Sequence, residues 1–310
     1  MDKVIVTGGA GFIGSHVVEE LIRRDYEVSV IDNFSSGHHE NIAGLPVKLY
    51  ICDVADPAVI NLIQSLKPDF IIHLAAQVSV ARSVKDPLLD ARTNVVGSLN
   101  VINAANSAGV KKVVFSSSAA VYGNPKSLPV LTSHPAEPES PYGLTKLTVE
   151  NYLKMFDKFH HLSYGILRFS NVYGPRQDAE GEGGVVSIFA DRIRKGTPPM
   201  IYGDGKQTRD FIFVKDVAAA AVSALRVENS FCANVSSATS VSIIRLFEIM
   251  KAVSHSDIEV LYGPERQGDI RDSTLSNEET KSILNWVPCF DLVSGLRETL
   301  GIVSGRNAAL

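Results

Sequence analysis

The chain of 310 residues has little of several features that mark whole classes of protein. Its three cysteines, Cys52, Cys232 and Cys289, lie far apart and form no C-x-x-C pair. Such a set fits neither a disulfide framework nor a zinc site, so we expect free thiols in a reducing, cytoplasmic compartment. The eight histidines lack ligand spacing, because most are adjacent or isolated, as His73 is. The sequence therefore predicts no metal site.

Long apolar runs and a strong charge of either sign are also missing. The apolar stretch 217–225 is interrupted by Ser223 and is far shorter than the roughly 20 residues that span a bilayer. The chain opens directly on a strand-like run with no basic segment, so we expect no secretion signal. The net charge of −4 gives no basic surface for nucleic acid. We expect a protein that binds neither membranes nor nucleic acid.

Short apolar runs alternate with amphipathic stretches through the first half of the chain. The runs are continuous rather than alternating, which is typical of strands buried on both faces of a parallel sheet. Amphipathic helices are expected at 13–24 and 88–108. The pattern predicts an α/β fold with a doubly wound parallel sheet (Rossmann), whose ligands lie beyond the carboxyl ends of the strands. The predicted strands are 4–6, 28–31, 47–51, 70–74 and 113–115.

The pattern changes from about Asn171, where glycine and proline become frequent and the apolar runs become short. An apolar helix at 214–225 interrupts this region. We expect residues 1–170 to form a dinucleotide-binding domain to which 206–232 return. The remainder of 171–310 would then form a smaller C-terminal α+β lobe that binds substrate.

A glycine-rich motif, TGGAGFIG at residues 7–14, follows the first strand and opens the first helix. Gly8 allows a sharp turn, Gly11 lets backbone N–H groups approach a pyrophosphate, and Gly14 lets the helix pack closely. The helix N-terminus attracts phosphate. Asp32 ends the second strand, where a carboxylate accepts hydrogen bonds from ribose hydroxyls and repels a 2′-phosphate. The motif therefore predicts NAD as the cofactor.

The G-x-x-G-x-x-G spacing resembles the extended branch of the short-chain dehydrogenase/reductase superfamily. The resemblance implies that Asp53 and Val54 hold the adenine, that the segment HLAAQ at 73–77 passes beside the cofactor, and that Asn94 lies in the matching N-V-x-G helix. The cofactor contacts that it implies, besides the catalytic residues below, are Gly8, Gly11, Phe12, Ile13, Gly14, Asp32, Asn33, Asp53, Val54, Leu74, Ala75, Ala76, Gln77 and Asn94.

A Tyr-x-x-x-Lys pattern begins at Tyr122, Tyr142 and Tyr202. The first occurrence contains Pro125 and the last contains two glycines, so neither is expected to be helical. Only Tyr142 is followed by a sustained helical pattern, which extends to about residue 159. On that helix Tyr142 and Lys146 share one face.

This spacing suits an acid–base pair. A free phenol has a pKa of about 10, and a nearby ammonium and the nicotinamide ring favour the phenolate, which can deprotonate a sugar hydroxyl. Lys146 can also hold the nicotinamide ribose. Ser118 ends the fifth strand and is expected to bridge the substrate oxygen and Tyr142. The predicted catalytic residues are Ser118, Tyr142 and Lys146, of which Tyr142 and Lys146 also contact the cofactor.

The residues after Ser118 bear on the reaction type. Related dehydratases and decarboxylases carry acidic residues there, whereas this chain has Ala119 and Ala120, which transfer no protons. Epimerisation is therefore favoured. The remaining motifs resemble those of UDP-glucose 4-epimerases over about residues 3–300, which implies a UDP-hexose substrate, a transient 4-keto sugar and tightly bound NAD. The substrate contacts that the resemblance implies are Ser118, Tyr142, Asn171, Val185, Tyr202, Arg209, Arg266, Asp269 and Ser273.

Two of these contacts follow general chemistry as well, because arginines such as Arg209 and Arg266 pair with phosphate oxygens. Ser273 is small where relatives that reject N-acetylated sugars tend to be bulky, so we hypothesise that UDP-N-acetylhexosamines are accepted. Three alternatives stay open: a UDP-glucuronate 4-epimerase, a net sugar-nucleotide reductase, and a nucleotide sensor without catalysis. The resemblance also implies a homodimer formed by helices near 88–108 and 142–159.

Overall fold

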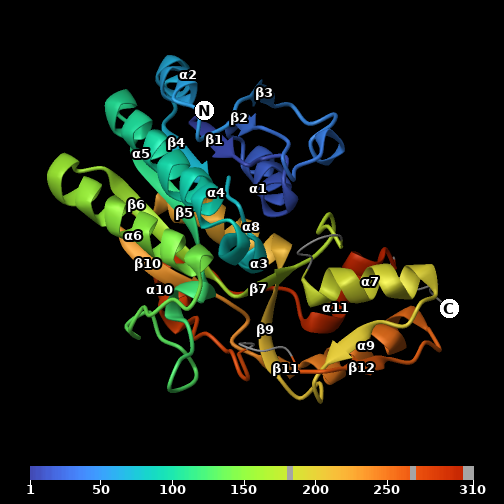
Figure 1. The fold of residues 1–310 in the computed structure, drawn as a ribbon. Coiled ribbons are helices and arrows are strands. Elements are labelled where there is room, and N and C mark those ends of the chain that lie inside the picture. Colours follow the sequence, from blue (N-terminus) through green and yellow to red (C-terminus); the bar gives the residue numbers. More distant parts are fainter. Residues whose placement is uncertain (180–183, 266–269, 303–310) are drawn as a thin grey trace.

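The computed structural model describes residues 1–179, 184–265 and 270–302. A parallel sheet of seven strands, in the order β10-β6-β5-β4-β1-β2-β3, forms its centre (Figure 1). The order changes direction at β1, which pairs with β2 on one side and β4 on the other. The predicted doubly wound fold is therefore confirmed. The strands are β1 (Lys3–Thr7), β2 (Glu27–Asp32), β3 (Lys48–Ile51), β4 (Phe70–His73), β5 (Lys112–Ser118), β6 (Ser163–Phe169) and β10 (Phe231–Val235).

Helices cover both faces of this sheet, as the continuous apolar strands require. On one face lie α1 (Phe12–Arg23) and α8 (Val214–Ser223), which pack against each other. On the other face lie α2 (Ala58–Leu66), α5 (Gly97–Ala108) and α6 (Pro141–His160) (Figure 1). Each group shares a separate apolar core with its face of the sheet.

The stretch 88–108, predicted as one amphipathic helix, is divided in the structure. A short helix α4 (Pro87–Ala91) leads into a π-helical turn η2 (Arg92–Val96) before α5 begins. Asn94 lies buried in this turn, where its side chain bonds to neighbouring segments. Such turns insert an extra residue into a helix and are frequent at functional sites. Apolar periodicity alone does not reveal them. Helix α3 (Val80–Lys85) precedes α4.

The second half of the chain forms short strands, as its glycine and proline content predicted. A three-stranded sheet and a two-stranded sheet are covered by three helices around a third apolar core. These elements are β7 (Asn171–Tyr173), β8 (Met200–Tyr202), β9 (Thr208–Phe213), β11 (Ser240–Ser242), β12 (Leu261–Gly263), α7 (Val185–Lys195), α9 (Ile243–Ser254) and α11 (Leu292–Leu300).

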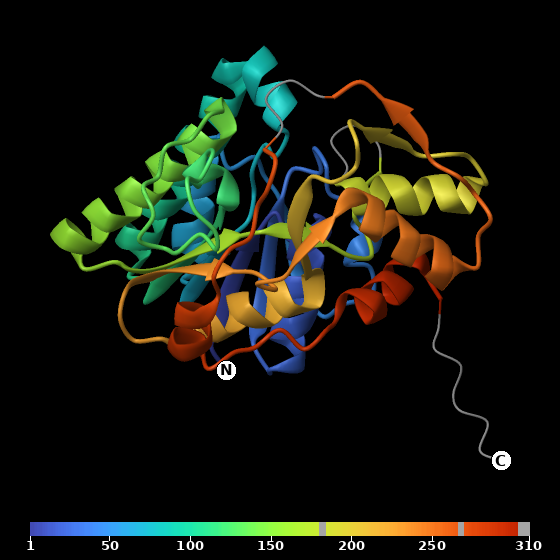
Figure 2. The same cartoon turned by 90° about the horizontal axis from the view of Figure 1, so that it is seen from below.

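Part of the second half returns to the large sheet. Figure 2 shows α8 and α10 (Glu278–Leu284) beneath that sheet, apart from α7, α9 and α11. Helix α8 packs on α1, and α10 packs on β10. These contacts suit the expectation that 206–232 return to the first domain, whereas the boundary at residue 170 stays a prediction. Within the described ranges, no helix has the length and apolar character to cross a bilayer.

Short 3-10 turns are η1 (His39–Asn41), η3 (Ala119–Tyr122) and η4 (Ala224–Arg226).

Candidate active site

Five neighbouring strands of the large sheet end at one edge, and each is followed or ended by a predicted site residue. Across β3, β2, β1, β4 and β5 these residues are Asp53, Asp32, Gly8, Leu74 and Ser118. The strand order changes direction within this set, between β2 and β4. Ligands of open α/β sheets bind at such a point, beyond the carboxyl ends of the strands.

The glycine loop is packed so closely that side chains would not fit. A Cβ atom on Gly8, whose φ is +71°, would lie 2.7 Å from the Ala75 nitrogen. A Cβ atom on Gly14 would lie 2.0 Å from the Gly8 carbonyl oxygen. Gly11 is the N-cap of α1, and no side chain of the described residues caps this helix. Its first N–H groups therefore suit a phosphate ligand.

Asp32 is 6% exposed and its carboxylate faces the glycine loop. Oδ2 accepts a hydrogen bond from the Ala10 N–H (2.9 Å), and Oδ1 accepts one from the Phe34 N–H (2.8 Å). A carboxylate accepts about four hydrogen bonds, so capacity remains for ribose hydroxyls. Nearby, the exposed Asn33 and Asp53 each accept a hydrogen bond from a backbone N–H two residues on. This donor and acceptor set fits NAD.

The catalytic candidates meet at the start of α6. Ser140 caps this helix by accepting from the Gly143 N–H (3.1 Å), and the Tyr142 N–H donates to Ser83 Oγ (3.1 Å). Tyr142 thus lies in the first turn, and Lys146 lies one turn further along. The Lys146 Nζ donates to the Ser116 carbonyl (2.8 Å) and lies 5.8 Å from the centre of the Tyr142 ring.

Burial shifts the pKa values of both Tyr142 and Lys146. Burial raises the pKa of Tyr142 to about 12, opposed by a hydrogen bond with Ser118 that favours the phenolate. Burial lowers the pKa of Lys146 to about 8. Desolvation thus favours the neutral form of each group, whereas each charged form stabilises the other. The structure brings Ser118, Tyr142 and Lys146 together as a coupled acid–base set.

A buried carboxylate that the sequence analysis missed lies beside this pair. Asp90, which is 0% exposed, accepts hydrogen bonds from Gln77 Nε2 (2.8 Å), Asn94 Nδ2 (3.0 Å) and Thr145 Oγ1 (2.9 Å). These donors come from the loop after β4, the π-helical turn and α6. The sequence held a weak signal, because Asp90 precedes the predicted Asn94 by one helical turn and Thr145 adjoins Lys146.

A second buried carboxylate lies one turn beyond Lys146 on α6. Glu150 Oε2 accepts from Arg168 Nη2 (2.6 Å), and Oε1 accepts from Arg168 Nε (2.9 Å) and Ser117 Oγ (2.6 Å). All three side chains are almost fully buried. This ion pair anchors α6 to β5 and β6 under the catalytic residues.

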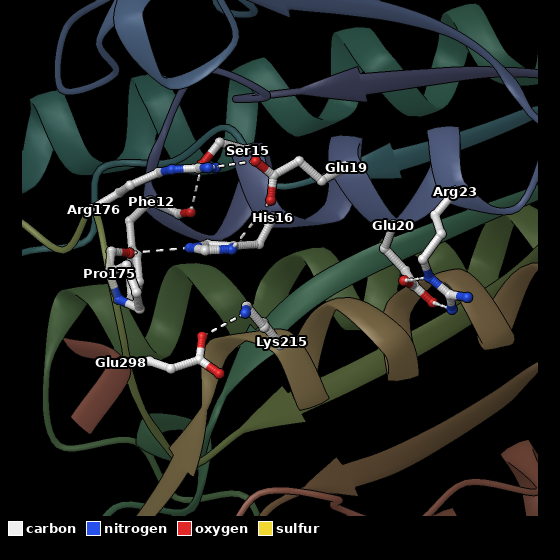
Figure 3. A network of polar contacts seen from close by, with 10 residues as sticks. All are labelled: Phe12, Ser15, His16, Glu19, Glu20, Arg23, Pro175, Arg176, Lys215 and Glu298. Atoms are coloured by element: carbon white, nitrogen blue, oxygen red, sulfur yellow. Dashed lines mark hydrogen bonds and ion pairs between the residues drawn. The ribbon is translucent and has the colours of Figure 1, made fainter. Parts of the chain in front are cut away.

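Contacts between α1 and the second half of the chain lie close to the glycine loop (Figure 3). The buried His16 follows that loop on α1, and burial lowers its pKa, which favours the neutral ring. Its Nε2 bonds the Pro175 carbonyl at 3.1 Å, and Arg176 forms an ion pair with Glu19. A further ion pair joins α8 to α11. Helix α1, which follows the glycine loop, is therefore joined to the segment that follows β7.

The predicted substrate contacts gather around β9. Arg209 lies on β9, and Asn171 begins β7 directly opposite Phe211 of β9. Ser273 follows Asp272, which bridges to Thr208 at the start of β9. These segments are far apart in sequence, and short strand pairings bring them together.

Two further contacts lie on neighbouring elements. Tyr202 ends β8 and lines a small cavity with Asp204 and Arg271, and Val185 begins α7. The remaining two, Arg266 and Asp269, lie outside the described residues.

Known proteins resemble this chain over nearly its whole length. Residues 4–234 match the model of the NAD dependent epimerase/dehydratase family. A UDP-glucose 4-epimerase of Mycolicibacterium smegmatis is 38% identical, with 98% of this chain and 99% of that protein covered. A UDP-glucose 4-epimerase of Thermotoga maritima, solved with UDP-glucose, is 41% identical with a TM-score of 0.94, covering 97% and 98%. A UDP-N-acetylglucosamine 4-epimerase of Methanobrevibacter ruminantium is 40% identical with a TM-score of 0.93, covering 97% of both chains.

Proposed function

Because the chain belongs to the NAD-dependent epimerase/dehydratase family, we propose that it is a UDP-hexose 4-epimerase that interconverts UDP-glucose and UDP-galactose. The chain is an NAD-dependent enzyme of the isomerase type, and the proposal adds its substrate. One observation carries the proposal: Tyr142 and Lys146 lie on α6 beside Ser118, at the sheet edge where the glycine loop ends. A phenol, an ammonium and a hydroxyl in this arrangement can move a proton to and from a sugar hydroxyl.

Each member of the trio has one task in the proposed reaction. NAD, when bound, supplies the acceptor and donor of the hydride that leaves and returns to the C4 carbon. Tyr142, as phenolate, takes the proton of the C4 hydroxyl and gives it back. Lys146 keeps the phenolate stable through its charge, and Ser118 orients the substrate oxygen. Since the 4-keto sugar must present its other face before reduction, binding energy must come mainly from the UDP part.

The residues after Ser118 support epimerisation over dehydration or decarboxylation. Ala119 and Ala120 form the 3-10 turn η3 with Val121 and Tyr122, so no carboxyl group occupies this turn. Proton transfer at the carbons beside the C4 ketone needs such a group. A reaction limited to hydride removal and return does not.

The UDP part of the substrate is assigned to the second half of the chain by the family resemblance. We propose that Asn171 and Arg209 bind the diphosphate, with Val185 and Tyr202 beside the nucleotide. The position of Arg209 on β9, between the bridge to Asp272 and the pairing with β7, supports this proposal. The contacts of Arg266 with phosphate and of Asp269 with the uridine ribose are proposed on the resemblance alone.

A second substrate class is favoured by one position. Ser273 is half-buried and small. On the family resemblance we place it beside the C2 carbon of the sugar, where a small side chain would leave room for an N-acetyl group. A similar structure bears the name UDP-N-acetylglucosamine 4-epimerase. We propose that UDP-N-acetylhexosamines are turned over as well.

The partner is proposed to be a second copy of the chain. One stripe of α6 carries three exposed apolar side chains: Leu144 (55% exposed), Met155 (50%) and Phe159 (65%). Two more apolar side chains are exposed, Leu88 on α4 and Val96 in η2. An exposed apolar stripe of this kind is typical of interfaces between copies. Phe159→Lys should convert a dimer to a monomer by light scattering, while Lys158→Ala, at the neighbouring position, should not. A wild-type monomer would overturn this assignment.

The activity is tested by incubating the purified protein with a panel of UDP-sugars and resolving the C4 epimers by chromatography. We expect UDP-glucose and UDP-galactose to interconvert with no net change in NADH absorbance. Stoichiometric formation of NADH would instead identify a net dehydrogenase, and stoichiometric consumption of added NADH or NADPH would identify a net reductase. Turnover of UDP-glucuronate alone would identify the uronate enzyme, and binding without turnover would identify a sensor.

A further inference from the structure

The negative charges of the two buried carboxylates near Lys146, Asp90 and Glu150, are compensated in different ways. Both carboxylate oxygens of Glu150 accept hydrogen bonds from the Arg168 guanidinium, through Nε and Nη2, so the charge of Glu150 is neutralised locally. In the described parts of the chain, Asp90 receives hydrogen bonds from neutral side chains and forms no ion pair. Burying a carboxylate without a cation in direct contact costs free energy. The charge of Asp90 must therefore be stabilised by a cation that it does not contact directly.

Among the described residues, Lys146 is a buried cation that adjoins a donor to Asp90. Thr145 bonds Asp90 Oδ2 and precedes Lys146 on α6, and Asn94, a second donor to Asp90, also lies 3.3 Å from Thr145 Oγ1. We infer that Asp90 is a positioning residue: its carboxylate is the counter-charge that keeps the Lys146 ammonium protonated, and it ties α6 to the loop after β4. The inference rests on the proposed function, because it assigns Asp90 a task in the acid–base pair.

The direction in which Asp90 shifts the pKa of its neighbours agrees with this assignment. The Asp90 charge raises the pKa of Lys146 and that of Tyr142, against the larger effect of burial on Lys146. Removing the charge should therefore ease the loss of a proton from either group, and both apparent pKa values of the pair should fall. A purely structural contact would not move them.

Other groups near Lys146 do not change their charge in the pH range in which Lys146 loses its proton. Burial lowers the pKa of His73 on β4 to about 3 and raises that of Tyr122 in η3 to about 12, so both stay neutral at ordinary pH. The carboxylate beside Arg168 on β6 raises the pKa of that guanidinium, which stays charged. Further cations on α3 and η2 are exposed, where water screens them: Arg82, Lys85 and Arg92.

The test compares Asp90→Asn with Thr145→Val in the NAD-loaded protein. Asparagine keeps the shape and most hydrogen bonds of Asp90 but removes its charge, whereas valine removes one hydrogen bond and keeps the charge. The side-chain nitrogen of Lys146, which is buried, is followed by NMR across a pH series in protein labelled with nitrogen-15 at its lysine side chains, and its chemical shift reports the neutral fraction. We expect the midpoint to fall by about 1 pH unit in Asp90→Asn and to stay in place in Thr145→Val. An unchanged midpoint in Asp90→Asn, or equal shifts in both variants, would overturn the inference.

A second measurement covers the case in which Asp90→Asn folds poorly. If Asp90 and Lys146 stabilise each other, the free energy of unfolding of Asp90→Asn/Lys146→Met should exceed the value expected from adding the two single changes. Additive losses would contradict the inference. Neither readout needs a substrate, so failure to epimerise any UDP-sugar would overturn the proposed function and leave this inference to be decided separately. When activity is present, the pH optimum of kcat should fall with the NMR midpoint of Lys146.

Discussion

The sheet edge that would hold NAD and the lobe that would hold the UDP-sugar are built in different ways. At the sheet edge, five neighbouring parallel strands end together, and backbone approaches as close as that of Gly8 to Ala75 leave no space for substitution. In the second lobe, three-residue strands and a single bridge between Thr208 and Asp272 join distant segments. The first region is thus fixed by many adjacent backbone contacts and the second by a few short strand pairings. Changes at the edge should abolish turnover, whereas changes in the lobe should select among sugars.

The largest effect is expected at the acid–base pair. Tyr142→Phe removes the phenol that transfers the proton, so turnover should fall by about 10³-fold. The side chain keeps its ring, and UDP affinity by calorimetry and NAD content should therefore stay at wild-type values. A variant that retains most of its rate would show that another group is the base.

The next effect concerns the glycine loop. Gly8→Ala should prevent NAD from co-purifying and should lower the free energy of unfolding by about 3 kcal/mol, because the new Cβ meets the Ala75 backbone. Gly109→Ala is the matched control, since Gly109 has the same φ of +71° with no atom within 4 Å of the added Cβ. It should cost about 1 kcal/mol and leave NAD bound. Denaturant titration and cofactor absorbance measure both. Equal behaviour of the two variants would contradict the close packing of the edge.

A smaller effect should appear in the pH dependence. The Lys146 ammonium is the active form, and its pKa is lowered to about 8, so kcat should decline as the pH rises through that value. This decline requires that the ammonium and bound NAD bring the pKa of Tyr142 below that of Lys146 in the loaded enzyme, and the acid limb should then report that lowered pKa. A pH–rate profile tests this decline, measured over the pH range in which the circular dichroism spectrum shows that the protein stays folded. Activity that keeps rising beyond the pKa of Lys146 would remove the requirement for the ammonium.

The smallest effect should come from the second lobe. Ser273→Tyr should reduce turnover of UDP-N-acetylglucosamine by about 10–100-fold and leave UDP-glucose within about threefold, because it narrows only the space at C2. Ser273→Ala is the size-matched control and should change neither. If wild-type protein shows no N-acetyl activity and Ser273→Tyr changes nothing, the position does not govern specificity.

The same difference between the regions explains how far sequence reasoning reached. The strands of the parallel sheet, the glycine loop, Asp32 and the Tyr142–Lys146 pair follow from local patterns, because each is a buried run, lies at the end of one or lies on one helix face. The π-helical turn at Asn94 and the role of Asp90 as its hydrogen-bond partner do not. They depend on donors that three separate elements bring together, and apolar periodicity carries no signal for such contacts.

The second lobe was the harder region to predict. Its strands are too short for a periodic signal, and the neighbours of Arg209 and Ser273 come from segments distant in sequence. Their assigned contacts rest on resemblance for that reason. The apolar stripe on α6 was visible as a helical pattern, but only the packed structure shows which of its residues are left exposed.

The central claim is that a hydride leaves the C4 carbon and returns to the same carbon within one protein-bound cycle. UDP-glucose labelled with deuterium at C4 tests it directly, with mass spectrometry and NMR of the UDP-galactose formed in ordinary water. The UDP-galactose should keep its deuterium at C4. Replacement of that deuterium by solvent hydrogen, or label lost to added free NAD, would contradict it.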